Sequence, residues 1–358
     1  MQRPTPAPPR ISVVVLTHDR AGQLVGTLAR LTSLPEQPPL FVADNASHDD
    51  TVKLVDMLFP QVRVVQCGAD LGAAGRNRAV ACVRTDYVAF CDDDSWWEPG
   101  SLAQAVKLLD GAPQVAVLSA RMVAGENGAT DAACMRMAAS PLATPGAPGP
   151  TLTGYLAGAC VFRTAVFRAV GGYERRLFTG GEEALLALDV LSAGYAIVYC
   201  RDLTVHRAAS AVGDRCGDDR GDDGGDGRRD NRARGVKRAR RVRDPSANRD
   251  PDTALRRRLL ARNAAWIAWL RLPWRDVCRT TFGALAMFAR EHTVWRDGRT
   301  MIAGIGWALA NRHRVNAQVL AMRAEAQAAE RRLARRGRAE RDAQHAKHTV
   351  AEPRSHDH

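Results

Sequence analysis

The sequence lacks the patterns that mark secreted, disulfide-rich or membrane-spanning proteins. Its eight cysteines are scattered, with no CxxC pair or zinc-ligand spacing, and several lie in apolar runs, so we expect reduced core residues. The first ten residues are rich in proline and carry no basic-then-apolar signal, and no apolar stretch reaches about 18 residues. These absences favour a cytoplasmic protein. With 46% hydrophobic residues over 358 positions, it can bury a full core.

Positive charge is scarce in the first part of the chain. Residues 1–200 contain 16 Lys and Arg against 19 Asp and Glu, whereas the rest contains 35 against 20, so the net charge of +12 comes from the C-terminal part. A nucleic-acid enzyme is usually basic around its cleft, and no recognisable nucleic-acid motif is present. We therefore expect no nucleic-acid partner. A basic tail on a mildly acidic globule fits a peripheral contact, or an ordinary solvated surface rich in arginine.

Apolar runs alternate with helical patterns four times along the first 110 residues. The four runs are residues 11–16, 40–43, 63–66 and 87–91, and the helical patterns are residues 21–34, 50–59, 73–83 and 99–109. This alternation predicts an α/β fold with a parallel sheet covered on both faces. Ligands of such a sheet bind at the carboxyl ends of its strands.

The remaining chain changes character several times. Residues 124–153 gather Gly, Pro, Ala and Ser and are expected to form a long loop. Order is expected to return from residue 155, with a helix over 183–193 and a strand over 196–199. Residues 213–249 are Asp, Gly and Arg with almost no apolar side chain, so we expect disorder there.

Three consecutive carboxylates, Asp92, Asp93 and Asp94, end the fourth apolar run. Clustered carboxylates repel each other unless a positive charge offsets them, and a divalent cation with phosphate ligands does so. An acidic turn or a helix cap would equally explain three consecutive aspartates. The position at a predicted ligand-binding edge favours the cation.

Polar residues also follow the first three apolar runs. Carboxylate, amide and guanidinium groups of this kind suit the ribose, base and phosphates of a nucleotide, although each alone reads equally well as a cap. The residues are Thr17, Asp19 and Arg20 after the first run, Asp44, Asn45 and Ser47 after the second, and Arg76 and Asn77 after Gly72.

The order and spacing of these motifs resemble family 2 glycosyltransferases of the GT-A fold. The resemblance is carried by VVVLTHDR, VADNASHDDT, DLGAAGRNRAV, YVAFCDDDSWWEPGSL, GACVFRTAVFRAVGGYERRLFTGGEEALLALDVLSAGYAIVYC and a final Val205-His206, over about residues 11–210. It implies a GT-A (Rossmann-like), mostly parallel sheet with helices on both faces. It also implies an inverting transferase that uses a nucleotide-diphosphate sugar, and bacterial surface-polysaccharide enzymes, including rhamnosyltransferases, are the most similar members.

The resemblance also implies roles for individual residues. Asp44 and Asn45 would bind the base side of the nucleotide, Thr17, Asp19, Arg20 and Arg76 would line its pocket, and Asp92 and Asp93 would approach the ribose. Asp92, Asp94 and His206 would hold Mn²⁺ or Mg²⁺. The family usually has Glu-Asp where this chain has Glu182-Glu183, so the base is one of these two, with Glu183 at the position of the Asp.

These roles imply a metal-assisted single displacement. The cation and the arginines would stabilise the departing diphosphate while a carboxylate removes the proton of an acceptor hydroxyl. The expected partners are a UDP- or dTDP-sugar, a glycan or lipid-linked acceptor, and an anionic membrane surface at the inner face of the plasma membrane. Residues 254–275 would make the membrane contact, because Arg and Trp alternate there on a helical pattern that would otherwise pack on the core.

Two other functions remain open from sequence. A sugar nucleotidyltransferase would share the sheet, but its Gly-rich loop after the first strand is only poorly matched by THDRAG. A non-enzymatic basic scaffold or nucleic-acid binder would depend on the Arg-rich tail. The predicted organisation is a flexible N-terminus (1–10), a GT-A catalytic domain (11–210), a disordered insertion (213–249), a helical basic extension (250–322) and a charged tail (323–358).

Overall fold

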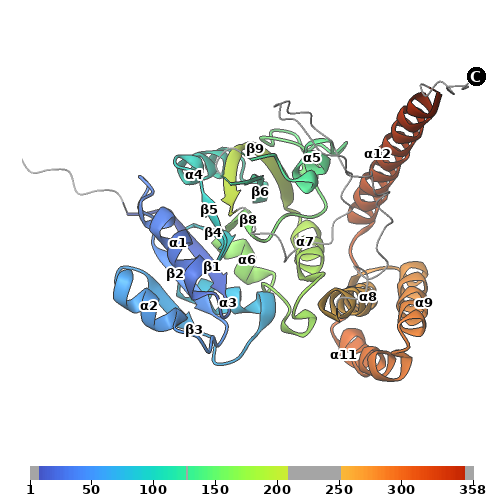
Figure 1. Ribbon diagram of the computed structural model, residues 1–358, viewed down its shortest axis with the longest axis horizontal. Coiled ribbons are helices and arrows are strands. Elements are labelled where there is room, and N and C mark those ends of the chain that lie inside the picture. The colour runs from blue at the N-terminus through green and yellow to red at the C-terminus, as the bar shows by residue number, and fades with distance from the viewer. Residues whose placement is uncertain (1–7, 126–127, 209–250, 351–358) are drawn as a thin grey trace, which may run out of the picture.

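A computed structural model describes residues 8–125, 128–208 and 251–350, without the side chains of residues 251–252 and 336–350. Within these residues the chain forms one nine-stranded sheet surrounded by helices, and a group of C-terminal helices lies beside it, next to α7 (Figure 1). The predicted disordered insertion at 213–249 lies outside the described residues.

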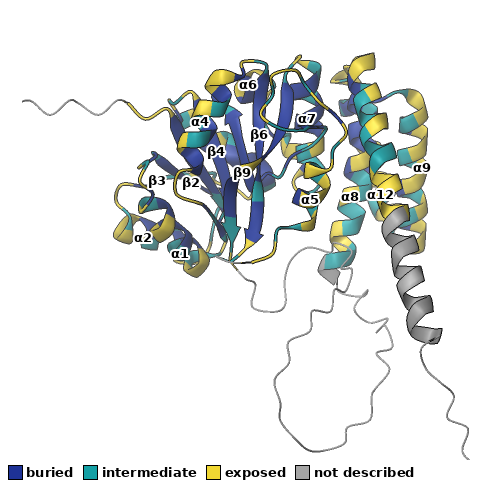
Figure 2. Cartoon of the chain, turned by 90° about the horizontal axis from the view of Figure 1, so that it is seen from above, coloured by how far each residue is buried: buried dark blue, intermediate teal, exposed yellow. Residues whose placement is uncertain are grey.

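The first half of the sheet is parallel. Strand order is β3-β2-β1-β4, formed by β1 (Ile11–Thr17), β2 (Leu40–Asp44), β3 (Arg63–Gln66) and β4 (Tyr87–Asp92). Continuous β-branched and aromatic residues fit strands that are buried on both faces, and β1, β2 and β4 are almost completely buried (Figure 2). Each of the four predicted strands is confirmed.

The second half of the sheet is mixed. Strand β8 runs antiparallel to both β4 and β6, whereas β6 and β9 are parallel, and β5 and β7 pair antiparallel with β9. The bounds are β5 (Ser95–Trp97), β6 (Val115–Ala124), β7 (Thr151–Leu152), β8 (Ala159–Arg163) and β9 (Ala196–Arg207).

Helices connect the strands and cover the sheet. Those of the first 192 residues are α1 (Ala21–Thr32), α2 (Thr51–Leu58), η1 (Gly72–Ala74), α3 (Gly75–Cys82), α4 (Ser101–Gly111), α5 (Ala132–Ala138), α6 (Thr164–Ala169), η2 (Arg175–Leu177) and α7 (Glu182–Ser192). The C-terminal group comprises α8 (Pro251–Arg271), α9 (Trp274–Arg290), the π-helical turn η4 (Val294–Gly298), α10 (Arg299–Ala303), α11 (Ile305–Ala310) and α12 (Ala317–Val350). The α/β fold class is confirmed.

Two expectations about the middle of the chain were wrong. The segment 124–153 is not a loop throughout, because Asp131 accepts a hydrogen bond from Ala133 N and caps α5, and β7 pairs with β9. Strand β9 runs well past Tyr199, because it pairs with β6 and β5 over its second part. Pairing between distant segments extends or creates these elements.

Helix α8 packs its apolar face against the sheet domain and its neighbouring helices. Trp266, Ile267 and Leu270 are buried, and Arg271 makes a two-fold ion pair with Asp189 of α7, at 2.5 and 3.0 Å. One face of this segment therefore packs on the core, and a membrane contact of its exposed face stays a prediction. Helix α12 continues without a break through the predicted boundary at residue 323.

The described part of the chain also shows where the cysteines lie and how apolar the helices are. Its seven cysteines are free, and four are buried, although Cys278 is exposed on α9. Within the same residues, none of the helices combines the length and apolar composition needed to cross a bilayer.

Candidate active site

Three polar strand ends meet at one edge of the parallel sheet. Thr17 of β1 is paired in register with Asp44 of β2, and Leu16 beside it is paired with Asp92 of β4. Parallel strands necessarily bring their carboxyl ends to the same edge. The structure thus brings together the residues that the sequence placed at the ends of separate apolar runs.

Asp93 is the buried centre of this edge. Its Oδ2 accepts a hydrogen bond from Thr17 Oγ1 at 3.2 Å and lies 3.9 Å from Arg20 Nε, and its carbonyl accepts from Thr27 Oγ1 at 2.8 Å. Burial raises the pKa of Asp93 to about 7, Arg20 opposes this, and the charges of Asp92 and Asp94 add to the rise. Asp93 therefore joins β1, α1 and β4 and is poorly placed to contact a ligand directly.

The residues after β1 and β2 are held by local turns. The Asp19 carboxylate accepts from His48 N at 2.5 Å, which lowers the pKa of Asp19, and Asp19 N donates to Ser47 Oγ. Asp44 accepts from Ser47 N at 3.2 Å. Asp19 has a φ of 50°, a left-handed backbone that a short polar side chain tolerates. These contacts fix two loops side by side.

Asn45 connects the second strand to the start of α3. Its Nδ2 donates to Gly72 O at 2.8 Å, while its Oδ1 is buried without a hydrogen-bond partner among the described residues. A Cβ on Gly75 would lie 2.2 Å from that Oδ1, so the close approach needs glycine there. An unsatisfied buried acceptor at a ligand-binding edge is available to a donor group.

Arg76 and Asp92 form the strongest polar contact of the site. Their Nη2 and Oδ1 atoms are 2.5 Å apart, with the guanidinium almost fully buried and 5.7 Å from the Tyr173 ring centre. Burial is the largest single influence and lowers the pKa of Arg76, but the charge of Asp92 and other nearby groups together outweigh it, so the pKa is raised. Arg76 Nε has no hydrogen-bond partner among the described residues. The pair holds one fixed positive charge beneath the acidic cluster.

Glu183, on the first turn of α7, lies close to the acidic cluster. Its Oε1 accepts from Ala157 N at 2.7 Å, and the next residue, Gly158, is packed so tightly that a Cβ there would lie 2.4 Å from Asp92 Oδ2. The short backbone segment before β8 therefore separates the two carboxylates. The structure brings Glu183 and Asp92 to the two sides of this segment, although they lie 91 positions apart in the sequence.

Both glutamates of α7 have raised pKa values. Burial raises the pKa of Glu183 to about 7, and the charge of Glu182 adds to the rise. Burial also raises the pKa of Glu182, whose Oε2 is buried without a hydrogen-bond partner among the described residues. A carboxylate with a pKa near 7 is suited to accept a proton at neutral pH.

The acidic cluster and His206 have the chemistry of a divalent cation site. Burial, with the charge of Asp92, raises the pKa of Asp94, so a cation nearby would relieve unfavourable charge. His206 lies opposite Trp96 on paired strands, and its Nδ1 is 2.9 Å from Gly125 O, which leaves Nε2 to act as a ligand when Nδ1 carries the hydrogen. Among the described residues, however, no three such side chains are close enough to hold a metal unaided.

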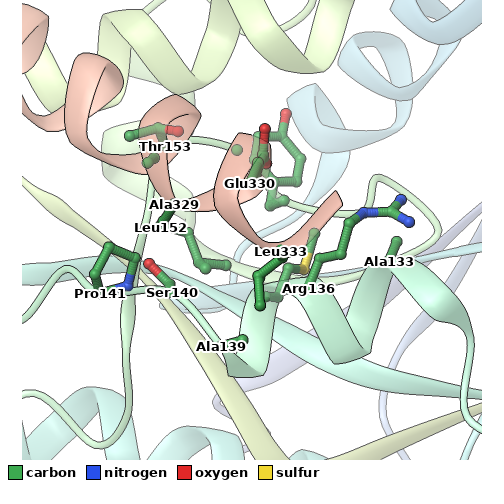
Figure 3. A pocket seen from close by; sticks show the side chains of 14 residues that line it. Ala133, Arg136, Ala139, Ser140, Pro141, Leu152, Thr153, Ala329, Glu330 and Leu333 are labelled. Atoms are coloured by element: carbon green, nitrogen blue, oxygen red, sulfur yellow. The ribbon is translucent and has the colours of Figure 1, made fainter. Parts of the chain in front are cut away.

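A cavity of about 260 Å³ lies elsewhere, between α5, the segment after β7 and α12 (Figure 3). Arg136 of α5 and Ala139 just after it face Ala329, Glu330 and Leu333 of α12 across it. None of the predicted site residues lines this cavity. It is therefore separate from the candidate active site.

Sequence reasoning missed the parts of the site that depend on tertiary contacts. The backbone of Ala157 and Gly158 carries no side-chain signal, and Thr27 lies in a helix with no distinguishing pattern. Asn263 had a usable signal. It is a polar residue on the apolar face of the 255–270 helical pattern, four positions from Leu259 and four from Ile267, and it is completely buried.

Comparisons with known proteins agree with this geometry. Residues 12–171 match glycosyl transferase family 2. An N-acetylglucosaminyl-diphospho-decaprenol L-rhamnosyltransferase of Mycobacterium tuberculosis (strain CDC 1551 / Oshkosh) is 25% identical over 239 residues, which cover 57% of this chain and 78% of that protein.

Two crystal structures of S. aureus TarS were also compared. The fragment 1-349 in complex with UDP-GlcNAc has a TM-score of 0.51 at 16% identity, covering 87% of this chain and 83% of that one. Another TarS structure has a TM-score of 0.46 at 20% identity, covering 56% of this chain and 36% of that one, so the chain spans about a third of its length. Residues 12–171 are thus similar to glycosyl transferase family 2, and the chain shares the fold of these glycosyltransferases, the GT-A fold.

Proposed function

We propose that the protein transfers a sugar, with inversion, from a UDP- or dTDP-sugar to a hydroxyl of a glycan or lipid-linked glycan. The family match supports glycosyl transfer from a nucleotide sugar. The name of the mycobacterial relative supports a deoxyhexose such as rhamnose as the sugar and a prenyl-diphosphate glycan as the acceptor.

One observation carries the proposal. Glu183 and Asp92 lie on either side of the same two-residue segment, with the Arg76 guanidinium against Asp92. A donor whose diphosphate lies over Asp92 and Arg76 would then present its anomeric carbon toward Glu183. Holding donor and acceptor in such an alignment lowers the barrier by about 7–11 kcal/mol at best.

The reaction is a single displacement. The acceptor oxygen bonds to the anomeric carbon as its proton passes to the Glu183 carboxylate, and the bond from the anomeric carbon to the diphosphate oxygen breaks with its electron pair leaving on the diphosphate. Glu182, beside the base, keeps the pKa of Glu183 high and is the alternative base.

Thr17, Asp19, Arg20, Asp44 and Asn45 are proposed to line the nucleotide pocket. Their loops lie together at the edge next to Asp92, and the unsatisfied Asn45 Oδ1 is an acceptor for a base or ribose donor. Asp93 supports this pocket from beneath through Thr17.

Asp92, Asp94 and His206 are proposed to hold Mn²⁺ or Mg²⁺. Within the described residues these three side chains do not come close enough together to hold an ion unaided, and such cations commonly complete their shell with substrate phosphates and water. When bound, the cation would offset the charge of the leaving diphosphate.

The family match favours glycosyl transfer over a sugar nucleotidyltransferase or a basic scaffold. The test uses a panel of UDP- and dTDP-sugars with a prenyl-diphosphate N-acetylglucosamine acceptor, with and without Mn²⁺ or Mg²⁺. We expect glycosylated lipid to form with one donor class and to disappear when EDTA is added. Release of pyrophosphate from a sugar phosphate and a nucleoside triphosphate would instead show a nucleotidyltransferase.

We also propose a cytoplasmic protein with a peripheral contact to an anionic membrane. The segment 254–275 keeps Leu255, Leu260 and Trp274 exposed, and beyond it Phe282 and Trp295 are exposed on the same helical group, at 70% and 92%. Exposed aromatic side chains among arginines suit a headgroup boundary. Equal sedimentation with neutral and anionic liposomes would contradict this contact.

A further inference from the structure

The loop before α7 is fixed by a buried asparagine from the C-terminal helices. Asn263 of α8 is completely buried, and its Nδ2 lies 2.8, 3.1 and 2.6 Å from the carbonyl oxygens of Leu177, Thr179 and Gly180. Arg262 Nε and Nη2 donate to the other side of the amide, Oδ1, at 3.1 and 2.9 Å. Since Oδ1 receives the guanidinium, the NH₂ group must face the loop.

The loop itself has a backbone that needs such support. Phe178 has a φ of 60°, and Gly180 and Gly181 have φ values of 84° and 96°. A non-glycine residue in the left-handed region costs free energy and persists only when its surroundings hold it. A Cβ on Gly180 or Gly181 would lie 2.7 or 2.9 Å from α8 side chains, so α8 is packed directly against this backbone.

The same loop also contacts the donor side of the site. Phe178 O accepts from Ala73 N at 2.9 Å, and a Cβ on Gly72 would lie 2.0 Å from that oxygen. Gly72 in turn accepts from Asn45. The loop is thus held between the nucleotide edge of the sheet and α8, and α7 begins directly after it.

We infer that Asn263 is a positioning residue for the transfer, acting through the 177–181 loop to fix where α7 begins and therefore where Glu183 lies. This inference rests on the proposed function, in which Glu183 is the base. Glu183 stands three residues after Gly180, whose carbonyl is bound at 2.6 Å. A displacement of about 1 Å at a reacting group is enough to cost about 100-fold in rate.

Among the described residues, the side-chain hydrogen bonds of Asn263 go to the loop just before α7 and to Arg262, so its loss should lower turnover more than donor binding. We expect Asn263→Ala to lower kcat about 10- to 100-fold, with donor KM and the number of nucleotide-binding sites per chain within twofold of wild type. Asn311→Ala is the matched control, because the side chain of this exposed asparagine of the same helical group has, among the described residues, only a local hydrogen bond, to Trp307 O.

Asn263→Asp covers the case in which the alanine variant does not fold. The substitution keeps the shape and places the new carboxylate beside Arg262, yet it replaces the donor by an acceptor facing three carbonyl groups. We expect the same loss of kcat. Either folded variant with wild-type kcat per nucleotide-binding site would overturn the inference.

A double-mutant cycle separates positioning of Glu183 from general damage. Glu183→Gln alone should lower kcat by about 10²- to 10⁴-fold. Adding Asn263→Ala to that variant should cause no further loss, because the base that Asn263 positions is already absent. If the double variant instead loses activity by the product of the two single losses, the inference is overturned while Glu183 remains the base. A Glu183→Gln enzyme with wild-type kcat would instead remove the proposed base, and the inference with it.

Discussion

The two halves of the active site are held in place in different ways. The nucleotide edge is held by the ends of neighbouring parallel strands and the loops that follow them, as in the contacts of Thr17 with Asp93 and of Asp44 with Ser47. The proposed base on α7 is held by a helix outside the sheet, through Asn263 and Arg271. The proposed nucleotide site therefore belongs to the sheet, whereas the proposed base is supported by the C-terminal helices.

The largest expected effect is a loss of sugar transfer when the nucleotide edge of the site is changed. Asp94→Ala should lower sugar transfer about 10³-fold, or about 4 kcal/mol in the barrier, because the charge of the leaving diphosphate loses its proposed cation. Donor affinity should also stop depending on Mn²⁺. Rates and donor binding measured across a Mn²⁺ titration test this.

Glu98→Gln is the control for Asp94→Ala, because Glu98 is an exposed carboxylate four residues further along the chain. It should leave both measurements unchanged. Full transfer and an unchanged cation requirement in Asp94→Ala would remove the acidic cluster from the mechanism.

The next effect should appear in stability. Arg271 and Asp189 are mostly buried, so Arg271→Ala leaves the Asp189 carboxylate with His313 Nε2, at 3.4 Å, in place of its two-fold arginine contact and should lower the free energy of unfolding by about 3 kcal/mol. Arg279→Ala breaks an exposed pair with Asp276 on α9 and should change the free energy of unfolding by less than about 0.5 kcal/mol. Urea denaturation of the two variants gives the difference, and equal values would show that α8 does not anchor α7.

The difference between the halves also explains what the sequence predicted. Strands β1 to β4 were predicted correctly, because β-branched runs are local patterns, and parallel pairing brings the polar residues after them to one edge. Helix α5 was missed because its signal is one capping residue, Asp131, in a Gly- and Pro-rich segment. The length of β9 and the role of Asn263 depend on contacts across more than 80 positions, which no local pattern contains.

A smaller effect should come from the glycine that begins α7. Gly181→Ala puts a Cβ where φ is 96° and 2.9 Å from Ile267 Cδ1, and should lower the free energy of unfolding by about 2 kcal/mol. Gly283→Ala on α9 has open space around the new Cβ, so it should raise the free energy of unfolding by about 0.5–1 kcal/mol. Thermal unfolding of both variants measures this contrast. A neutral Gly181→Ala would mean that α8 does not constrain this backbone.

The smallest expected effect is a dependence of kcat/KM on pH, set by the proposed base on α7. The base must be ionised, and burial raises the pKa of Glu183 to about 7 with help from the charge of Glu182. The value of kcat/KM should therefore rise about tenfold per pH unit below pH 7 and level off above it. Glu182→Gln removes the neighbouring charge, so the rise should move to lower pH while the plateau remains. Rate profiles from pH 5 to 9 test both enzymes, and an activity that survives in Glu183→Gln but not in Glu182→Gln would assign the base to Glu182.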